Sequence, residues 1–185
     1  MKPQPSWFVL ANSEKCTGCK ACEIACFALH NENNGVRHTV GTVTTPVIPR
    51  LYLTRAETKC MPVQCRQCED APCLNSCSSK AITKIDGIMV VNEETCQGCK
   101  NCLLACPFGA IELLPLYDDA KPVKQASVNE TKVAAYKCDR CYKRDEPACV
   151  SACPHEALRK ADVAAEVMDK KLKAALSLAS LEQHL

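Results

Sequence analysis

The chain has few aromatic residues, no long apolar run and almost no net charge. Its 185 residues include one Trp, four Tyr and three Phe, fewer than a conventional core of this size usually uses. Its apolar stretches fall far short of the roughly 20 residues that a membrane-spanning helix needs. A formal net charge of +2 excludes a strong electrostatic footprint for nucleic acid, and no nucleic-acid-binding motif is present. A chain of this length forms one domain or two small ones, and something besides aromatic packing must hold it together.

Signals for export and for catalysis are also missing. Residues 1–7 carry neither a signal peptide nor a twin-arginine address, which predicts a cytoplasmic protein. The sequence shows no nucleophile–base pair, nucleotide-binding loop or open metal position. We therefore expect a non-catalytic component, with any catalysis left to partner proteins.

Cysteine is the residue that the chain has in excess. It occurs 17 times; sixteen of these cysteines form four quartets, and only Cys60 is left over. The first and third quartets are spaced C-x2-C-x2-C-x3-C, the second C-x2-C-x4-C-x3-C and the fourth C-x2-C-x7-C-x3-C. In chain order the quartets are Cys16, Cys19, Cys22, Cys26; Cys65, Cys68, Cys73, Cys77; Cys96, Cys99, Cys102, Cys106; and Cys138, Cys141, Cys149, Cys153.

Three chemistries could use so many cysteines. Disulfides need an oxidising compartment, for which the sequence carries no export signal. Structural zinc sites combine two separated cysteine pairs around one ion, which leaves a third and a fourth cysteine at these spacings without a role. The first spacing is that of bacterial 4Fe–4S ferredoxins. We predict four 4Fe–4S clusters, an electron-carrying protein and an apo-chain that does not fold, because metal binding is coupled to folding.

The chain repeats itself in a way that predicts its fold class. Residues 16–22 (CTGCKAC) are echoed by residues 96–102 (CQGCKNC). Gly18 and Gly98 lie between the first two cysteines of their quartets, where the backbone must curl round a cluster and glycine permits the required dihedrals. We expect an α+β fold, a duplicated bacterial-ferredoxin-like module of cysteine loops, short helices and small antiparallel strands, followed by a C-terminal amphipathic helix.

Several strands can be expected between the quartets. Asp86-Gly87 is a hairpin signal between strands over 81–85 and 88–91. A further strand is expected over 110–114 and a strand pair around 39–43 and 47–52, whereas residues 116–136 are polar and predict a loop.

The spacing between quartets predicts how they share clusters. Only 18 residues separate Cys77 from Cys96, close to a compact ferredoxin repeat, so we pair the second quartet with the third and the first with the fourth. In such pairs the fourth cysteine of each run ligates the other cluster. Naming each site after the quartet that supplies three ligands, site 1 is Cys16, Cys19, Cys22 and Cys153; site 2 is Cys65, Cys68, Cys73 and Cys106; site 3 is Cys96, Cys99, Cys102 and Cys77; and site 4 is Cys138, Cys141, Cys149 and Cys26.

This pairing predicts the domain organisation. Residues 1–160 would form one four-cluster domain, with an inner unit over 60–115 and an outer unit built from 12–30 and 136–160. Residues 161–185 would form the C-terminal helix.

A few residues stand outside the quartets. Cys60 is expected to be a small buried apolar residue and not a ligand; the alternatives are a redox-active thiol and an alternate ligand. The four histidines are not expected to bind iron, because each quartet already supplies four thiolates.

The final segment predicts an amphipathic helix, because apolar residues recur at three- and four-residue intervals. They are Val163, Val167, Met168, Leu172, Ala175, Leu176 and Ala179. Three occupants of this apolar stripe stay open: the ferredoxin body, a partner or second copy of the chain, and a membrane surface.

The pattern over residues 12–160 resembles the electron-transfer subunits of molybdopterin oxidoreductases. Some relatives replace one cysteine and hold a 3Fe–4S centre, whereas all sixteen ligands are present here. Residues 65–73 (CRQCEDAPC) and 137–139 (KCD) look most like the small iron–sulfur subunits of formate hydrogenlyase and hydrogen-dependent carbon dioxide reductase.

The resemblance implies a subunit that carries single electrons between a molybdenum or tungsten formate dehydrogenase and a hydrogenase, beside other iron–sulfur subunits. It also implies that the C-terminal helix can take part in filament formation. Two alternatives remain: an electron-transfer subunit of another molybdopterin reductase, and an iron–sulfur assembly or maturation factor.

Overall fold

A computed structural model describes residues 7–32, 45–118, 121–125, 130–142 and 144–182. Its helices are α1 Ala21–His30, α2 Pro72–Asn75, α3 Asn101–Ala105, α4 Ala148–Ser151 and α5 Val163–Glu182. Its strands are β1 Trp7–Ala11, β2 Tyr52–Ala56, β3 Lys59–Val63, β4 Ile82–Ile85, β5 Ile88–Val91, β6 Glu112–Pro115, β7 Tyr117–Asp118, β8 Lys121–Pro122, β9 Val133–Tyr136 and β10 Leu158–Asp162.

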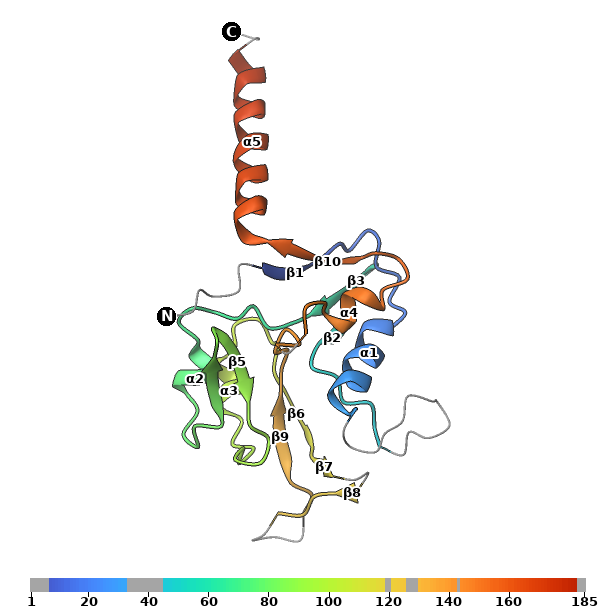
Figure 1. The fold of residues 1–185 in the computed structure, drawn as a ribbon, viewed down its shortest axis with the longest axis vertical. Helices are drawn as coiled ribbons and strands as arrows, with labels where there is room; N and C mark the ends of the chain where they lie inside the picture. Colours follow the sequence, from blue (N-terminus) through green and yellow to red (C-terminus); the bar gives the residue numbers. More distant parts are fainter. Residues whose placement is uncertain (1–6, 33–44, 119–120, 126–129, 143, 183–185) are drawn as a thin grey trace.

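The strands form small antiparallel pairs that lie around the short helices (Figure 1). The pairs are β1–β10, β2–β3, β4–β5, β6–β9 and β7–β8. The mixture of short helices and two-stranded sheets confirms the expected α+β class.

The predicted hairpin is present as β4–β5. Ile82 lies opposite Val91, and the turn falls at Asp86-Gly87. Both turn residues have positive φ, 48° and 82°, as a two-residue type I′ turn requires. The local sequence alone therefore determines this register.

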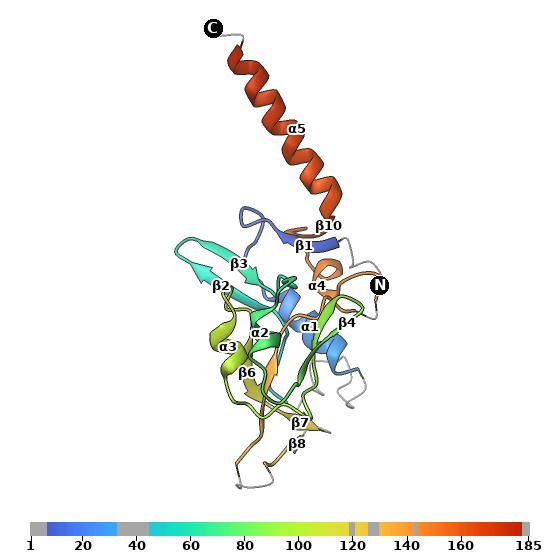
Figure 2. The ribbon, with the colours of Figure 1, turned by 90° about the vertical axis from the view of Figure 1, so that its left-hand side faces the viewer.

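A second strand pair with the same register joins the two ends of the body. β1 and β10 are antiparallel, with Ala11 opposite Leu158 (Figures 1 and 2). Ala11 precedes its quartet by five residues, as Val91 does, and Leu158 follows its quartet by five residues, as Ile82 does. The β1–β10 pair thus repeats the register of the β4–β5 hairpin without a connecting turn.

Two expectations between the quartets were wrong. The strand expected over 47–52 begins only at Tyr52, where β2 starts; Pro46 and Pro49 precede it, and proline lacks the N–H that a strand ladder uses. Residues 116–136 are not simply a loop, because they contain β7, β8 and β9. The strand expected around 39–43 lies outside the described residues.

The strand pairs β2–β3 and β6–β9 form another repeat. β3 ends two residues before Cys65, and β9 ends two residues before Cys138. Each strand therefore delivers the chain to the first cysteine of the quartet that follows it.

The C-terminal helix projects away from the body instead of packing on it (Figures 1 and 2). It begins at Val163, two residues later than predicted, because Ala161 and Asp162 complete β10. Asp162 Oδ1 accepts the Ala165 N–H at 3.0 Å, an N-terminal cap. Met168 and Leu172 on the predicted apolar stripe are 67% and 58% exposed.

Of the three occupants predicted for the apolar stripe, the ferredoxin body is therefore wrong. None of the helices in the described ranges is both long and apolar enough to span a membrane.

The core consists of two hydrophobic clusters in which cysteine takes part. One contains Val9, Cys22, Cys26, Leu51, Cys149 and Leu158. The other contains Ala71, Cys73, Ala81, Ile82, Met89, Cys96, Cys102, Ile111, Ala134, Ala135 and Tyr136. Each cluster has few large buried apolar side chains besides its cysteines, which fits a fold whose cysteines bind a cofactor.

Candidate iron–sulfur sites

The four cysteines assigned to site 1 line one pocket. Its lining includes Cys16, Cys19, Cys22 and Cys153, with apolar walls from Leu53 and Leu158. Burial raises the pKa of the Cys22 thiol to about 11. Cys153 comes from the other end of the sequence, and the β1–β10 pair brings it here.

Three cysteines of site 4, namely Cys26, Cys138 and Cys149, are buried, and Cys141 is half-buried. Burial raises the pKa of the Cys26 thiol well above its usual range, and three neighbouring thiolates raise it further, those of Cys138, Cys141 and Cys149. Burial likewise raises the pKa of Cys138, to about 12. The structure thus brings Cys26 of α1 next to the fourth quartet.

The cysteines assigned to sites 2 and 3 also influence one another. Burial raises the pKa of Cys73, and the thiolates of Cys65 and Cys106 raise it further. Burial raises the pKa of Cys102 to about 11, and three thiolates act on it as well, those of Cys96, Cys77 and Cys99. Cys68 packs against the same hydrophobic cluster as these residues.

Backbone N–H groups point at many of the sulfurs. The N–H groups of Gln67 and Arg140 each donate to the first cysteine of their quartet at 3.4 Å. Further N–H donors to sulfur are Arg50 to Cys26 at 3.3 Å, Ala135 to Cys96 at 3.4 Å, Ala110 to Cys106 at 3.5 Å and Ala157 to Cys153 at 3.3 Å. Such bonds stabilise negative charge on sulfur, which is the environment that a thiolate-ligated cluster requires.

The repeated loops also explain Cys60. Gly18 and Gly98 have φ values of +78° and +66°, and a Cβ on them would lie 3.0 Å from Cys60 Sγ and 2.6 Å from Val133 Cγ2, respectively. Cys60 and Val133 each precede the next quartet by five residues, on the equivalent strands β3 and β9. Cys60 therefore occupies the position that valine fills in the other repeat and is buried as an apolar residue would be.

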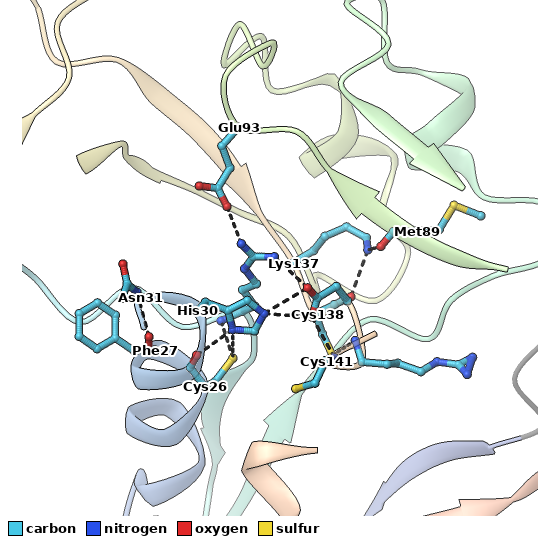
Figure 3. Close-up of polar contacts among 12 residues, drawn as sticks. Cys26, Phe27, His30, Asn31, Met89, Glu93, Lys137, Cys138 and Cys141 are labelled. Carbon is cyan, nitrogen blue, oxygen red and sulfur yellow. Dashed lines mark hydrogen bonds and ion pairs between the residues drawn. The ribbon is translucent and has the colours of Figure 1, made fainter. Parts of the chain in front are cut away.

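A polar network that the sequence did not reveal surrounds Cys26 (Figure 3). His30 Nδ1 lies 3.6 Å from Cys26 Sγ, and His30 Nε2 lies 3.1 Å from both carboxylate oxygens of Asp139. Arg50 donates to Asp139 at 3.0 Å and to Glu93 at 2.8 Å. Burial raises the pKa of Asp139, but His30 and Arg50 outweigh it and hold the pKa well below its usual range.

The network depends on the length of α1. After Cys106, Pro107 ends the equivalent helix α3 at Ala105, whereas Phe27 follows Cys26 and α1 continues to His30. No local motif marks His30 and Asp139 as partners, since 109 residues separate them.

The donor set fits a cluster with one thiolate for each iron. Among the residues that the structure describes, no three His, Cys, Asp or Glu side chains gather closely enough to hold a single ion. A cubane needs no such convergence, because each of its four irons takes one protein sulfur. Buried thiols with raised pKa values would be deprotonated by iron, and the clusters would add redox chemistry that the side chains lack.

Neighbouring sites are linked by packing and by a hydrogen bond. Cys22 of site 1 and Cys26 and Cys149 of site 4 belong to one hydrophobic cluster, and Gln67 Nε2, two residues after Cys65 of site 2, donates to the Cys138 carbonyl of site 4 at 2.8 Å. Sites 2 and 3 share one hydrophobic cluster. Cys19 of site 1 and Cys99 of site 3 are exposed. The cysteine loops, short helices and strand pairs define a ferredoxin-like iron–sulfur protein.

Comparisons with known proteins agree with this class. Residues 56–163 match the model of the 4Fe–4S dicluster domain family, a region that holds the last three quartets. The Electron transport protein HydN of Escherichia coli (strain K12) is 39% identical over 157 residues, which cover 82% of this chain and 85% of that protein.

Two relatives from the same strain are named as parts of larger assemblies. Hydrogenase-4 component A is 37% identical over 175 residues, covering 82% of this chain and 80% of its own. Formate hydrogenlyase subunit 2 is 35% identical over 179 residues, covering 84% and 81%. The chain belongs to the 4Fe–4S dicluster family and is an electron-transport iron–sulfur protein related to these subunits.

Proposed function

We propose that the chain relays single electrons through four 4Fe–4S clusters, held at sites 1 to 4 with the ligands assigned above. The proximity of Cys26 to the fourth quartet, of Cys106 to the second and of Cys77 to the third supports the exchange of fourth ligands. The pocket shared by Cys153 and the first quartet supports the remaining set.

The observation that carries the proposal is the series of packing contacts that runs through the four candidate sites. Cysteines of sites 1 and 4 share one hydrophobic cluster, cysteines of sites 2 and 3 share the other, and Gln67 Nε2, from the loop that opens the second quartet, donates to the Cys138 carbonyl of site 4 at 2.8 Å. Cys19 and Cys99 are exposed, whereas Cys26, Cys73, Cys138 and Cys149 are buried. The order 1–4–2–3 would let partners exchange electrons at either end while the protein shields the middle from water.

The protein's own part in this relay is to exclude water and to set potentials. Buried loops, N–H groups aimed at sulfur and fixed charges near a site all change the free energy of adding an electron to it. No side chain has to react, so the chain would be a non-catalytic subunit.

We propose that the two ends face a formate dehydrogenase and a hydrogenase, as part of an enzyme complex in the cytoplasm. The names of two relatives, Hydrogenase-4 component A and Formate hydrogenlyase subunit 2, support partners of this kind. A subunit of another molybdopterin reductase would use the same line of sites. An assembly factor would need clusters that leave readily, and the burial of the central thiols favours the relay over it.

We also propose two units and a separate helix. The inner unit over 60–115 carries sites 2 and 3; the outer unit from 12–30 and 136–160 carries sites 1 and 4 and would include β1 and β10 as well. Exposed apolar residues on α5 support self-assembly of the chain through residues 161–185.

Rapid mixing of the purified complex with formate, and separately with hydrogen, tests the relay. The iron–sulfur absorbance should bleach at least as fast as the complex turns over. Bleaching that is much slower than turnover would contradict the proposal, and mass spectrometry of co-purified proteins would identify the partners.

A further inference from the structure

The loops that open the second and fourth quartets have the same backbone but different charge. Gln67 and Arg140 each follow the first cysteine by two residues, with φ values of 53° and 55°. Each donates its backbone N–H to that cysteine's sulfur at 3.4 Å. One loop therefore carries an amide where the other carries a guanidinium.

A second equivalent pair differs in the same way. Gln64 and Lys137 immediately precede the first cysteine of their quartets. Gln64 Nε2 donates to the Val9 carbonyl at 3.1 Å, and Lys137 Nζ donates to the Met89 carbonyl at 2.6 Å (Figure 3). Val9 and Met89 each lie seven residues before the quartet that follows them, on β1 and β5. An amide is thus sufficient for this contact, and the contact alone does not require a cation.

Burial of the Lys137 ammonium is energetically unfavourable unless negative charge lies nearby. Its side chain is 2% exposed, and its hydrogen-bond acceptors are the carbonyls of Met89 and Cys138. A buried ammonium is strongly disfavoured unless anionic groups compensate it. Thiolates on both sides can supply that compensation: burial raises the pKa of Cys73 and of Cys138, and the Lys137 charge opposes both rises.

Arg140 lies at the same junction. Burial lowers the pKa of its guanidinium, and the thiolates of Cys138 and Cys65 oppose this shift. Its NH1 donates to the Trp7 carbonyl at 2.6 Å, and its guanidinium lies 5.3 Å from the Trp7 ring centre. Gln67 Nε2 and Lys137 Nζ both donate to the Cys138 carbonyl, at 2.8 Å and 3.1 Å. Lys137 and Arg140 therefore place two positive charges where the loops of sites 4 and 2 meet.

Other charges also lie near the sites. Asp139 lies between Cys138 and Cys141 of site 4, and Arg50 donates to its carboxylate at 3.0 Å. Lys20 lines the pocket of site 1, and its ammonium lies 3.8 Å from the Glu23 carboxylate. Negative charge near a site opposes the arrival of an electron, and positive charge favours it.

We propose that Lys137 and Arg140 are tuning residues that make sites 4 and 2 easier to reduce than glutamines at these two positions would. This inference rests on the proposed cluster sites and adds the residues that set two of their potentials.

The test is an anaerobic redox titration of the full chain followed by EPR. Lys137→Gln and Arg140→Gln install the residues found at the equivalent positions 64 and 67. Cys26→Ser and Cys106→Ser identify the signals of sites 4 and 2. Arg140→Lys keeps the charge, and Lys84→Gln removes an exposed lysine of β4 as the control.

Each Gln substitution should lower the one-electron reduction equilibrium at the central sites by at least about tenfold, or about 59 mV. The potentials of the terminal sites should not change in either Gln variant. In Arg140→Lys and Lys84→Gln, all four potentials should stay near those of the natural protein.

Two results would overturn the inference. One is a Gln variant with full iron content but unchanged potentials at sites 4 and 2. The other, which needs no Gln variant to fold, is an Arg140→Lys variant with full iron content whose central potentials fall by about 59 mV, although it keeps the charge. Fewer than four clusters in the natural protein would instead contradict the proposed function, so the two failures are distinguishable.

Discussion

The β4–β5 hairpin and the β1–β10 pair have the same register but are closed in different ways. A two-residue turn at Asp86-Gly87 joins β4 to β5, so their pairing is local. β1 and β10 come from opposite ends of the body, with Trp7 opposite Asp162. Asp162 follows its quartet by nine residues, as Asp86 does, but it caps α5 instead of starting a turn.

The difference shows what the clusters must contribute to folding. Closing a loop across most of the chain costs more conformational entropy than closing a two-residue turn. The outer strand pair has five residues on each strand to offset that cost. We infer that ligands exchanged between the first and fourth quartets supply the remaining stabilisation, as metal binding does in other small metal-dependent domains.

The largest expected effect comes from the matched ligand variants Cys26→Ser and Cys106→Ser. Cys26→Ser should remove the site 4 cluster, about four of sixteen irons, and weaken the closure of the outer unit. Cys106→Ser should disturb site 2 and leave the β1–β10 pair formed. Iron analysis and cluster-resolved EPR measure both. Loss of the site 1 signal in Cys26→Ser, with site 4 intact, would show that the quartets keep their own fourth cysteines.

A second matched pair compares the buried Asp139 with Arg66, which takes the equivalent place in the second quartet and is exposed. Asp139→Asn removes one of the two carboxylates that pair with Arg50. Breaking a buried ion pair costs about 3–5 kcal/mol, so the free energy of unfolding should fall by about this amount. Arg66→Gln should change the free energy of unfolding by less than about 0.5 kcal/mol. Chemical denaturation under anaerobic conditions provides the comparison.

The pH dependence of the Asp139 effect has a definite sign. Because the pKa of Asp139 is lowered in the folded protein, its ionised form stabilises the fold above the unfolded value of about 3.9. The difference from Asp139→Asn should therefore be present above about pH 5 and should shrink as the pH falls below about 4. A difference that does not shrink below about pH 4 would mean that another group carries the effect.

Features that depend on neighbouring residues could be predicted from the sequence, whereas contacts between distant residues could not. The Asp86-Gly87 hairpin, the glycine turns and the helical C-terminus were all predictable, because each depends on neighbouring residues. The contact of His30 with Asp139 was not, since no local signal joins two residues that meet only after the whole fold forms.

Some local signals were also misleading. The polar composition of residues 116–136 predicted a loop, but this stretch contains the short strand β9, in which Ala134, Ala135 and Tyr136 are buried. The amphipathic pattern of α5 indicated an apolar stripe but could not show that the stripe would face away from the body.

Removing α5 should leave every site intact. Deletion of residues 163–185 keeps β10 complete and should preserve iron content and EPR signals, while the size of the assembly falls. Light scattering under anaerobic conditions measures that size. As a milder variant, Leu172→Lys should act in the same direction, because it places a charge on the apolar stripe. An unchanged assembly size would discard self-assembly through α5.

The smallest effect is expected at Cys60. Cys60→Val makes β3 resemble β9, where Val133 packs on the equivalent glycine turn. Valine is larger than cysteine, and such small-to-large core changes typically cost about 1–3 kcal/mol, but no cluster ligand is lost. Iron content and all four potentials should be unchanged. Cys65→Ser, five residues away, should lose iron and serves as the contrast. Iron loss in Cys60→Val would reveal Cys60 as a ligand.

The most direct test of the account is an iron-edge anomalous scattering map from anaerobically grown crystals. We predict four iron peaks in a line, in the order site 1, site 4, site 2 and site 3, with Cys26 at the peak of the fourth quartet and Cys153 at that of the first. A map that places Cys26 beside the same iron atoms as Cys16, Cys19 and Cys22, or that shows fewer than four peaks, would contradict it.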